Sequence, residues 1–161
     1  MSTAWIGVGS NVGDRAGFCR QAVDELKNSG VVQVDAASSL YETSPVGGPP
    51  QRSFINLVVG VSTDATPRQL LELAKSIEKR LGRETDQMRW GPRIVDLDIL
   101  AIDGVTVAEA DLQIPHPRLT ERAFALIPLL EIDPGVSDPT GKPYAAFLPE
   151  AEGEAEVLEP F

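Results

Sequence analysis

The segment RWGPRIVDLDIL, residues 89–100, places two carboxylates inside an apolar run that has the composition of a β-strand. Because side chains in a strand alternate between faces, Asp96 and Asp98 point to one side. Leu97 and Ile99 point to the other side, toward a core. Two neighbouring carboxylates on an open face suit Mg²⁺, a hard cation that also takes phosphate oxygens. Taken alone, the pattern is more typical of an amphipathic strand with one solvated face, and a magnesium site is the alternative.

Cations gather just before this strand. Residues 79–93 contain five of the chain's 14 lysines and arginines, namely Lys79, Arg80, Arg83, Arg89 and Arg93. Guanidinium groups donate in a planar fork that matches phosphate oxygens, so arginines beside an acid pair indicate phosphoryl-transfer chemistry. The two cations at 79 and 80 equally suit a helix C-terminus, where they complement the dipole. Two interpretations stay open for Trp90, which either stacks on a ligand ring or fills the core.

His116 is the only histidine and lies in the segment IPHPR, residues 114–118. Prolines on both sides restrict the backbone, which favours a fixed direction for the imidazole. Arg118 and Arg122 follow closely. Beside a phosphate site, this histidine would donate to phosphate or transfer a proton, and the alternative is an ordinary loop residue.

The glycines at positions 7, 9 and 13 do not form a known phosphate loop. A dinucleotide-binding G-x-G-x-x-G motif would need glycine at position 12, which is Val12. A Walker motif would need a lysine where this chain has Asp14. The segment GSN, residues 9–11, instead indicates a tight turn from a strand to a helix, with Asn11 able to hydrogen-bond locally or to a ligand.

The elements that must position these residues follow from hydrophobic periodicity. We predict strands at 3–9, 32–41, 54–61 and 94–102, and helices at 14–29 and from Thr66 to Gly82. The strand at 54–61 is almost continuously apolar, so it should be buried on both faces. Thr66 and Gln69 form a capping-box pattern, with Pro67 at the first helical position. The order β-α-β-β-α-β is typical of an α+β, ferredoxin-like sandwich with a mainly antiparallel sheet.

Further elements follow this unit. Residues 120–131 predict a short helix capped by Thr120 and interrupted near Pro128, and the fold should include extra C-terminal helix and hairpin elements. Residues 43–53 are too rich in proline and glycine for regular structure, which is typical of a functional loop. The acidic segment 150–161 is predicted to be a loosely held tail.

Composition limits the classes of function. The 161 residues are 42% hydrophobic and 24% charged, which predicts one globular domain over 1–161. A net charge of −10 disfavours nucleic acid and anionic membrane surfaces as partners. We find no signal-peptide pattern and no apolar run near the roughly 20 residues of a membrane span, so we expect a cytoplasmic protein. The single Cys19 and single histidine exclude an internal disulfide and a Cys/His zinc site.

Taken together, four segments resemble the 6-hydroxymethyl-7,8-dihydropterin pyrophosphokinase family of folate biosynthesis. These are GSNVGDR, YETSPVGGPPQRSFINLVV, RWGPRIVDLDIL and IPHPRLTERAFALIPL, which together span residue 4 to about 135. The combination of the third and fourth segments is highly specific. The family fold is ferredoxin-like with extra elements, which agrees with the strand and helix order predicted from periodicity.

The resemblance implies transfer of pyrophosphate from ATP to the hydroxymethyl group of 6-hydroxymethyl-7,8-dihydropterin, with release of AMP. The pterin oxygen would attack the β-phosphorus of ATP. By the same resemblance, two Mg²⁺ ions bind to Asp96 and Asp98 and bridge the ATP phosphates, and Asp96 also faces the hydroxymethyl group.

The resemblance also assigns the other site residues. Asn56 would read the amide edge of the pterin, and Phe54 and Phe124 would stack on its two faces. Main-chain groups of Thr43, Ser44 and Val46 would complete the pterin pocket. The implied ATP ligands are Glu78, Arg83, Trp90, Arg93, main-chain groups near Ile99, His116 and Arg122. The implied catalytic set is Asp96, Asp98, Arg83, Arg93 and His116.

Some positions depart from the family pattern. Lys75, Thr85, Asp111 and Gln113 stand where some members carry other residues near the nucleotide, so we expect retained activity with altered ATP affinity or loop closure. The segments 43–53 and 83–92 are predicted to close over both substrates and exclude water. We expect a monomer.

Two other functions remain open from the sequence. A Mg²⁺-dependent nucleotide pyrophosphohydrolase would also use paired acids and arginines, but it would not need Asn56 and two aromatic residues arranged for a flat ring. A non-catalytic nucleotide- or pterin-binding regulator would bind without turnover and would tolerate Asp98→Asn.

Overall fold

The computed structural model describes residues 1–43, 53–82 and 94–161. Their elements, in chain order, are β1 Ser2–Ser10, α1 Arg15–Asn28, β2 Val32–Ala37, β3 Leu40–Thr43, β4 Phe54–Thr63, α2 Pro67–Gly82, β5 Asp96–Ile102, β6 Val107–Glu109, β7 Leu112–Ile114, the short 3₁₀ helix η2 Leu119–Glu121, α3 Ala123–Ile132, the 3₁₀ helix η3 Tyr144–Glu150 and β8 Ala155–Glu159. No helix in this part of the chain is long and apolar enough to cross a membrane.

One sheet organises the molecule. Within the described residues it has six strands in the order β5-β1-β4-β3-β8, with β2 also paired to β4. All of these pairings are antiparallel. The α+β class and the mainly antiparallel sheet predicted from the sequence are therefore confirmed.

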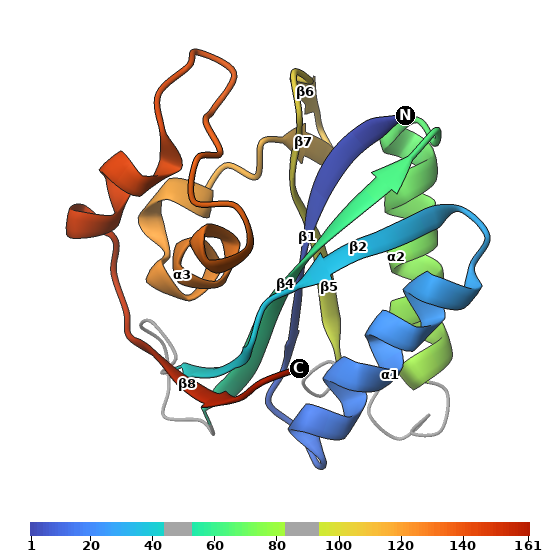
Figure 1. Ribbon diagram of the computed structural model, residues 1–161. Coiled ribbons are helices and arrows are strands. Elements are labelled where there is room, and N and C mark those ends of the chain that lie inside the picture. Colours follow the sequence, from blue (N-terminus) through green and yellow to red (C-terminus); the bar gives the residue numbers. More distant parts are fainter. Residues whose placement is uncertain (44–52, 83–93) are drawn as a thin grey trace.

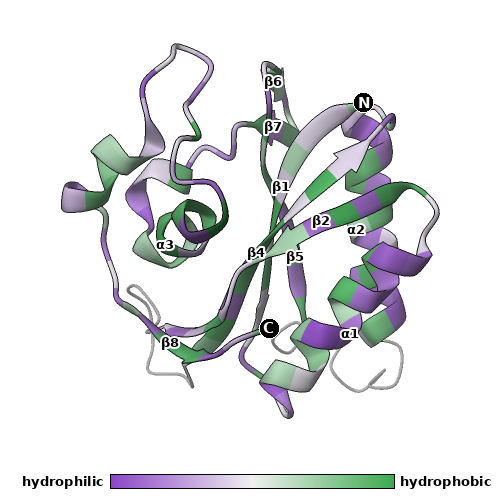
Figure 2. Ribbon diagram, in the orientation of Figure 1, coloured by the Kyte–Doolittle hydropathy of each residue, from purple (hydrophilic) through white to green (hydrophobic). Residues whose placement is uncertain are grey.

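The two faces of the sheet are covered by different elements. Helices α1 and α2 lie on one face, and α3 lies on the other (Figure 1). The larger core cluster packs between the sheet and α1 and α2, with the apolar sides of both helices turned toward the strands (Figure 2). A second cluster, which includes Trp5, Val58 and Leu100, packs against α3. Because β4 contributes to both clusters, its predicted burial on two faces is confirmed.

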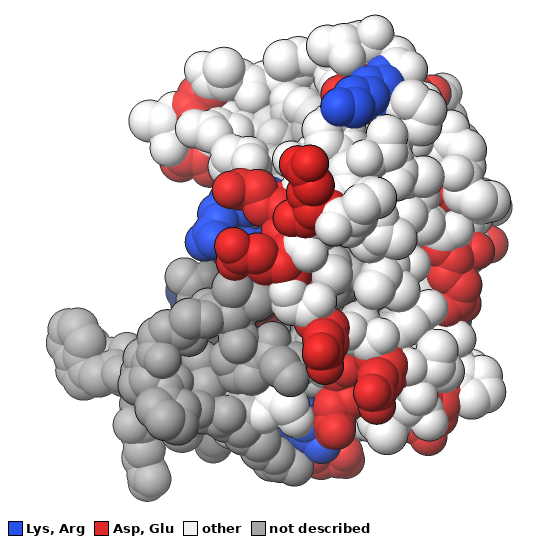
Figure 3. Space-filling view, turned by 90° about the vertical axis from the view of Figure 1, so that its left-hand side faces the viewer, with Lys and Arg blue, Asp and Glu red and all other residues white. Residues whose placement is uncertain are grey.

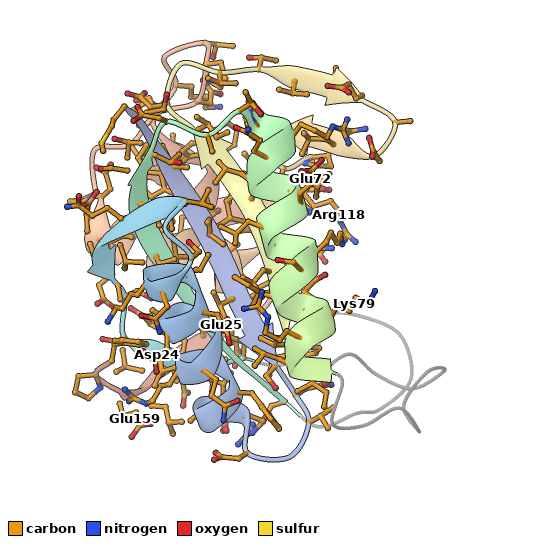
Figure 4. The ribbon with its side chains drawn as sticks, turned by 90° about the vertical axis from the view of Figure 1, so that its right-hand side faces the viewer. Asp24, Glu25, Glu72, Lys79, Arg118 and Glu159 are labelled. Carbon is orange, nitrogen blue, oxygen red and sulfur yellow. The ribbon has the colours of Figure 1, made fainter. Side chains whose placement is uncertain are left out.

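Both predicted N-terminal helices form close to their expected bounds. At α1, the Asp14 carboxylate accepts the Gly17 main-chain N–H at 3.1 Å. At α2, the Gln69 N–H donates to Thr66 Oγ1 at 3.1 Å and the Thr66 N–H donates to Gln69 Oε1 at 2.8 Å, which confirms the capping box. The two helices lie side by side in Figure 4, where Glu25 of α1 points toward α2 and forms an ion pair with Arg80.

The single strand predicted at 32–41 is wrong, because the structure divides it into β2 and β3 at Ser38 and Ser39. Ser38 is fully buried. Its N–H donates to the Val58 carbonyl at 2.8 Å, and its hydroxyl accepts the Val58 N–H at 2.9 Å. A side-chain oxygen thus replaces a main-chain acceptor, which lets the chain bend between the two strands without leaving Val58 unpaired.

The helix predicted at 120–131 also differs in detail. Thr120 lies inside η2, and α3 begins after Arg122, whose side chain makes no capping hydrogen bond. Pro128 lies within α3, which continues to Ile132. A helical proline costs about 3 kcal/mol, and burial of Ala125, Leu126 and Leu129 against the sheet offsets that cost.

The C-terminal segment is attached to the sheet, where the sequence predicted a loose tail. β8 pairs with β3. Beyond it, the Arg20 side chain on α1 donates to the Pro160 carbonyl at 3.1 Å and lies 5.0 Å from the centre of the Phe161 ring. Strand pairing and these contacts order the acidic segment 150–161, for which composition alone predicted a loosely held tail.

A small hairpin of β6 and β7 extends beyond β5. Arg68, near the start of α2, donates to Asp111 at 2.6 Å and to Glu109 at 2.5 Å. These exposed ion pairs link the hairpin to α2. After β7 the chain returns to the sheet, where the His116 N–H donates to the carbonyl of Leu100 on β5.

Candidate active site

The acid pair lies on β5, on the sheet face that α3 covers. Asp98 is exposed and Asp96 is half-buried. Leu97 and Ile99 belong to the core on the opposite face. The predicted alternation along β5 is therefore confirmed, and both carboxylates open into one cleft.

This cleft has a volume of about 260 Å³ and lies between the sheet and the segment that leads into α3. Residues from β1, β3, β4, β5 and the segment 116–125 meet there. The described residues that line it are Gly7, Val8, Gly9, Thr43, Phe54, Asn56, Leu57, Val58, Asp96, Asp98, Leu100, His116, Arg118, Leu119, Arg122, Phe124 and Ala125.

Eight of these residues were predicted from the sequence as site residues. They are Thr43, Phe54, Asn56, Asp96, Asp98, His116, Arg122 and Phe124, and they come from segments up to about eighty residues apart in the chain. Their meeting in one cleft is a finding of the structure. The roles assigned to them by resemblance stay predictions.

His116 is fixed by main-chain contacts on both sides. Its N–H donates to the Leu100 carbonyl of β5 at 2.8 Å. Its ring Nδ1 accepts the Arg118 N–H at 3.2 Å, so the neutral ring carries its proton on Nε2. Burial has the largest effect and lowers the pKa of His116, while the Asp98 carboxylate raises it and Arg122 and Arg118 lower it. The neutral imidazole is therefore favoured near pH 7 and offers one N–H donor.

Two arginines complete the cationic side of the cleft. The Arg122 guanidinium carbon lies 5.4 Å from the centre of the Phe124 ring, within the range of a cation–π contact. Arg118 lies 3.8 Å from the Glu121 carboxylate. The sequence placed Arg118 next to His116 but gave it no role, and its spacing from His116 was the available signal.

Polar and aromatic residues line the same cleft. The Asn56 side chain of β4 donates from Nδ2 to Thr43 Oγ1 at 2.6 Å. Thr43 is 2% exposed, so this hydroxyl is withdrawn from solvent and available to orient the carboxamide. Phe54 and Phe124 are half-buried on the lining of the same cleft. Two aromatic surfaces and one oriented amide are what a flat heteroaromatic ligand requires.

Glu78 has a different position from the cleft-lining residues. From α2, its carboxylate accepts the Leu97 N–H at 2.8 Å, and Lys75 lies 3.3 Å from its other oxygen. This bond holds β5 at the point between Asp96 and Asp98. Ile99 is 6% exposed and packs in the core opposite the cleft, so its predicted role could involve only main-chain atoms.

Sequence reasoning missed the reason for the glycines of β1. Ile6 and Val8 belong to the core below α1 and α2. Gly7 and Gly9 alternate with them and line the cleft on the opposite face. The alternation of large and absent side chains along 6–9 was the signal that could have identified them as the cleft floor.

Five predicted site residues lie outside the described residues. They are Ser44, Val46, Arg83, Trp90 and Arg93. The same holds for Arg89 and Thr85, and for most of the two segments predicted to close over the substrates.

The donor chemistry of the cleft fits Mg²⁺. This ion usually keeps several waters and binds through one or two carboxylates together with phosphate oxygens. Asp96 and Asp98 supply two carboxylates on one face of β5. Among the residues described, no group of three or more His, Cys, Asp or Glu side chains is arranged to hold a metal. Two carboxylates agree with the number that this ion usually takes from a protein when phosphate oxygens and waters complete its coordination.

Comparison with known proteins gives a consistent result. The family model described as 7,8-dihydro-6-hydroxymethylpterin-pyrophosphokinase (HPPK) matches residues 5–134. A Bacillus subtilis protein named 2-amino-4-hydroxy-6-hydroxymethyldihydropteridine pyrophosphokinase is 48% identical over 129 residues, which are 80% of this chain and 77% of that protein. A protein of the same name from Aquifex aeolicus is 37% identical over 162 residues, covering 100% of this chain and 96% of its own length.

Solved structures show a similar fold. The wild-type HPPK-DHPS protein of Plasmodium falciparum matches 92% of this chain with a TM-score of 0.72 at 16% identity. An HPPK-DHPS structure in complex with substrates matches with a TM-score of 0.73 at 14% identity. The chain spans less than half of these larger proteins, at 44% and 43% of their lengths.

Proposed function

Because the chain belongs to the 7,8-dihydro-6-hydroxymethylpterin-pyrophosphokinase family, we propose that its cleft transfers pyrophosphate from ATP to the hydroxymethyl group of a reduced pterin. This reaction serves folate biosynthesis and releases AMP. One observation carries the assignment to this cleft. A carboxylate pair, a histidine with two arginines, and an amide with two phenylalanines all line the same cleft.

The half of the cleft around Asn56 would bind the pterin. Its carboxamide, oriented by Thr43, offers a donor and an acceptor to the edge of the ring. Phe54 and Phe124 would hold the two ring faces. Asp96 and Asn56 both lie opposite Gly9 of β1, one on each side of it. Asp96 is therefore closer to the pterin half of the cleft than Asp98 is. Asp96 would therefore face the hydroxymethyl oxygen.

The other half would bind the triphosphate of ATP. Asp96 and Asp98 would hold two Mg²⁺ ions, which when bound supply charge neutralisation and orientation for the phosphates. His116 would donate from Nε2 to a phosphate oxygen, and Arg122 would add a fixed positive charge. The family resemblance adds Arg83, Trp90 and Arg93 as ATP ligands, and Glu78 supports the same strand from behind. Transfer would then depend on holding the pterin oxygen in line with the β-phosphorus.

The finer fold assignment is also a proposal. We infer a ferredoxin-like arrangement with extra C-terminal elements. The order β5-β1-β4-β2 supports it, together with α1 and α2 on one face of the sheet. The monomeric state and the cytoplasmic location stay predictions from the sequence.

An assay that separates AMP from ADP tests the function. Purified protein would be incubated with ATP, Mg²⁺ and 6-hydroxymethyl-7,8-dihydropterin, with each component omitted in turn. AMP and the pterin diphosphate should form in equal amounts, and only in the complete mixture. AMP without the pterin would favour a nucleotide pyrophosphohydrolase. Binding of both ligands without turnover would favour a non-catalytic regulator.

A further inference from the structure

One row of residues crosses the sheet at the cleft floor. In the strand register, Asn56 of β4 lies opposite Gly9 of β1, and Gly9 lies opposite Asp96 of β5. On the other side of β4, Asn56 lies opposite Tyr41 of β3. Neighbouring strands are about 4.8 Å apart, so the main-chain positions of Asn56 and Asp96 are about 10 Å apart, with Gly9 between them.

Gly9 is the crowded member of the two cleft glycines. A Cβ added at Gly9 would overlap with Oδ1 of Asn56, far inside van der Waals contact. A Cβ added at Gly7, two residues earlier on the same face, would meet Leu100 at 3.4 Å, which is an ordinary contact distance. The Asn56 carboxamide therefore occupies the space that a side chain at position 9 would fill.

The other end of this carboxamide is held as well. Its Nδ2 donates to Thr43 Oγ1 at 2.6 Å, and Thr43 is buried. The Asn56 side chain thus lies between a buried hydroxyl on β3 and the bare main chain of Gly9 on β1. These two contacts define the plane in which its remaining donor and acceptor are offered to the cleft.

We propose that Gly9 is a positioning residue for pterin recognition, because its lack of a Cβ leaves the space in which the Asn56 carboxamide must lie. This inference rests on the proposed function of the cleft. It assigns Gly9 no contact with the reacting atoms. It also explains why a β-strand interior carries glycine, which otherwise weakens a strand.

Filling this space should weaken pterin binding without lowering the stability of the fold. The atom that a Cβ would displace is the end of a side chain, which can rotate away, and the next atoms, Asn56 Cγ and the Ile55 carbonyl oxygen, lie at 3.4 and 3.6 Å. Alanine at position 9 therefore leaves the sheet intact. It forces the carboxamide out of the plane set by Thr43, so a hydrogen-bonded ligand edge loses its partner.

The test is Gly9→Ala, assayed for steady-state kinetics of both substrates and for thermal unfolding. The KM for the pterin should rise about tenfold or more, while the KM for ATP, kcat at saturating pterin and Tm stay within about twofold or a few degrees of wild type. Gly60→Ala is the matched control. Gly60 lies in the interior of β4 away from the cleft, and an added Cβ there would meet its nearest atom, Ile132 Cδ1, at 3.6 Å.

A double-mutant cycle separates positioning from a general effect on the cleft. In an Asn56→Ala background, Gly9→Ala should change the pterin KM by less than about twofold, because the displaced group is already absent. If Gly9→Ala raises the pterin KM equally in both backgrounds, the residue does not act through Asn56 and the proposal is overturned. Thr43→Val, which removes the hydroxyl with little change of shape, should raise the pterin KM without changing the ATP KM; an unchanged pterin KM would also count against it.

The results for the wild-type protein distinguish failure of the proposed function from failure of the positioning role of Gly9. If wild type forms AMP only with the pterin and Gly9→Ala is indistinguishable from it, the positioning role fails and the proposed function stands. If wild type neither turns over nor binds the pterin, both fail.

Discussion

Asp96 and Asp98 place negative charge in a cleft that must accept a polyanion, so their effect on ATP depends on what neutralises them. Replacing either by asparagine keeps the shape and removes the charge. We expect Asp96→Asn and Asp98→Asn each to lower kcat about 100-fold or more, because metal charge neutralisation in the transition state is lost. Steady-state assays of AMP formation measure this effect.

Asp103→Asn is the control for the acid pair. Asp103 is exposed in the turn directly after β5 and does not line the cleft. Its activity should match wild type, and all three variants should unfold at similar temperatures. Near-normal turnover of Asp98→Asn would contradict the proposed role of the pair and favour the binding-only regulator.

His116 offers a test of cleft electrostatics, because it is the chain's single histidine. Burial lowers the pKa of its imidazole, and the nearby arginines add to this effect while Asp98 opposes it. We expect the ring resonances in an NMR titration of the free protein to shift with a midpoint below about 6.5, the value of an unperturbed histidine. A midpoint at or above that value would show that Asp98 dominates over burial and the arginines.

The same shift has a consequence for stability. An unfolded chain protonates this imidazole more readily than the folded protein does. The contribution to the free energy of unfolding is therefore fully present above about pH 6.5 and is lost as the pH falls through the lower native pKa. Between pH 7.5 and pH 5, the free energy of unfolding measured with urea should fall further in wild type than in His116→Gln, because only wild type carries this imidazole.

At the scale of elements, the start of α2 allows a quantitative test. Thr66 Oγ1 accepts the Gln69 N–H, and Gln69 returns a bond to the Thr66 N–H. Thr66→Ala should lower the free energy of unfolding by about 1 kcal/mol, measured by urea denaturation. Thr106→Ala is the control, since Thr106 is exposed and directly precedes β6. Equal effects of the two changes would argue that the capping box contributes nothing measurable.

The elements that local pattern predicts well are those with their own signals. Helices α1 and α2 have caps and an apolar stripe, and β1, β4 and β5 have strong strand composition. The break at Ser38 is different, because it depends on a hydrogen bond to Val58, twenty residues away in the chain. The uninterrupted course of α3 through Pro128 and the attachment of β8 depend likewise on packing and pairing with distant partners. Periodicity within one segment contains no information about those partners.

At the scale of the whole molecule, the sequence indicates which residues belong to the site more readily than how they are arranged in space. The resemblance named Asn56, Asp96 and His116, but only the strand register shows that Gly9 lies between the amide and the carboxylate. The position of Glu78 is a similar case. Its bond to the Leu97 N–H on β5 can be seen only when α2 and β5 are packed together.

The net charge of the molecule opposes the binding of an anionic ligand in the cleft. The chain has a net charge of −10, and among the charged side chains visible in Figure 3 Asp and Glu are more prominent than Lys and Arg. A free ATP tetra-anion is therefore repelled at long range and by Asp96 and Asp98 at short range. Among the described residues that line the cleft, the positive charges of Arg118 and Arg122 offset only part of this negative charge. ATP binding should for this reason depend on a divalent cation that travels with the phosphates.

Removing that cation gives the corresponding prediction. With Mg²⁺ present, ATP at about 100 times its Kd should stabilise the folded protein by about 2.7 kcal/mol, which corresponds to a rise in Tm of roughly 5–10 °C for a chain of this size. Excess EDTA should abolish this rise, because without the divalent cation the triphosphate and the two cleft carboxylates repel each other. In Asp98→Asn, where one of those charges is gone, the shifts with Mg²⁺ and with EDTA should converge. An equal rise in Tm with and without EDTA in the wild-type protein would show that the arginines alone bind the triphosphate, and that the acid pair acts after binding.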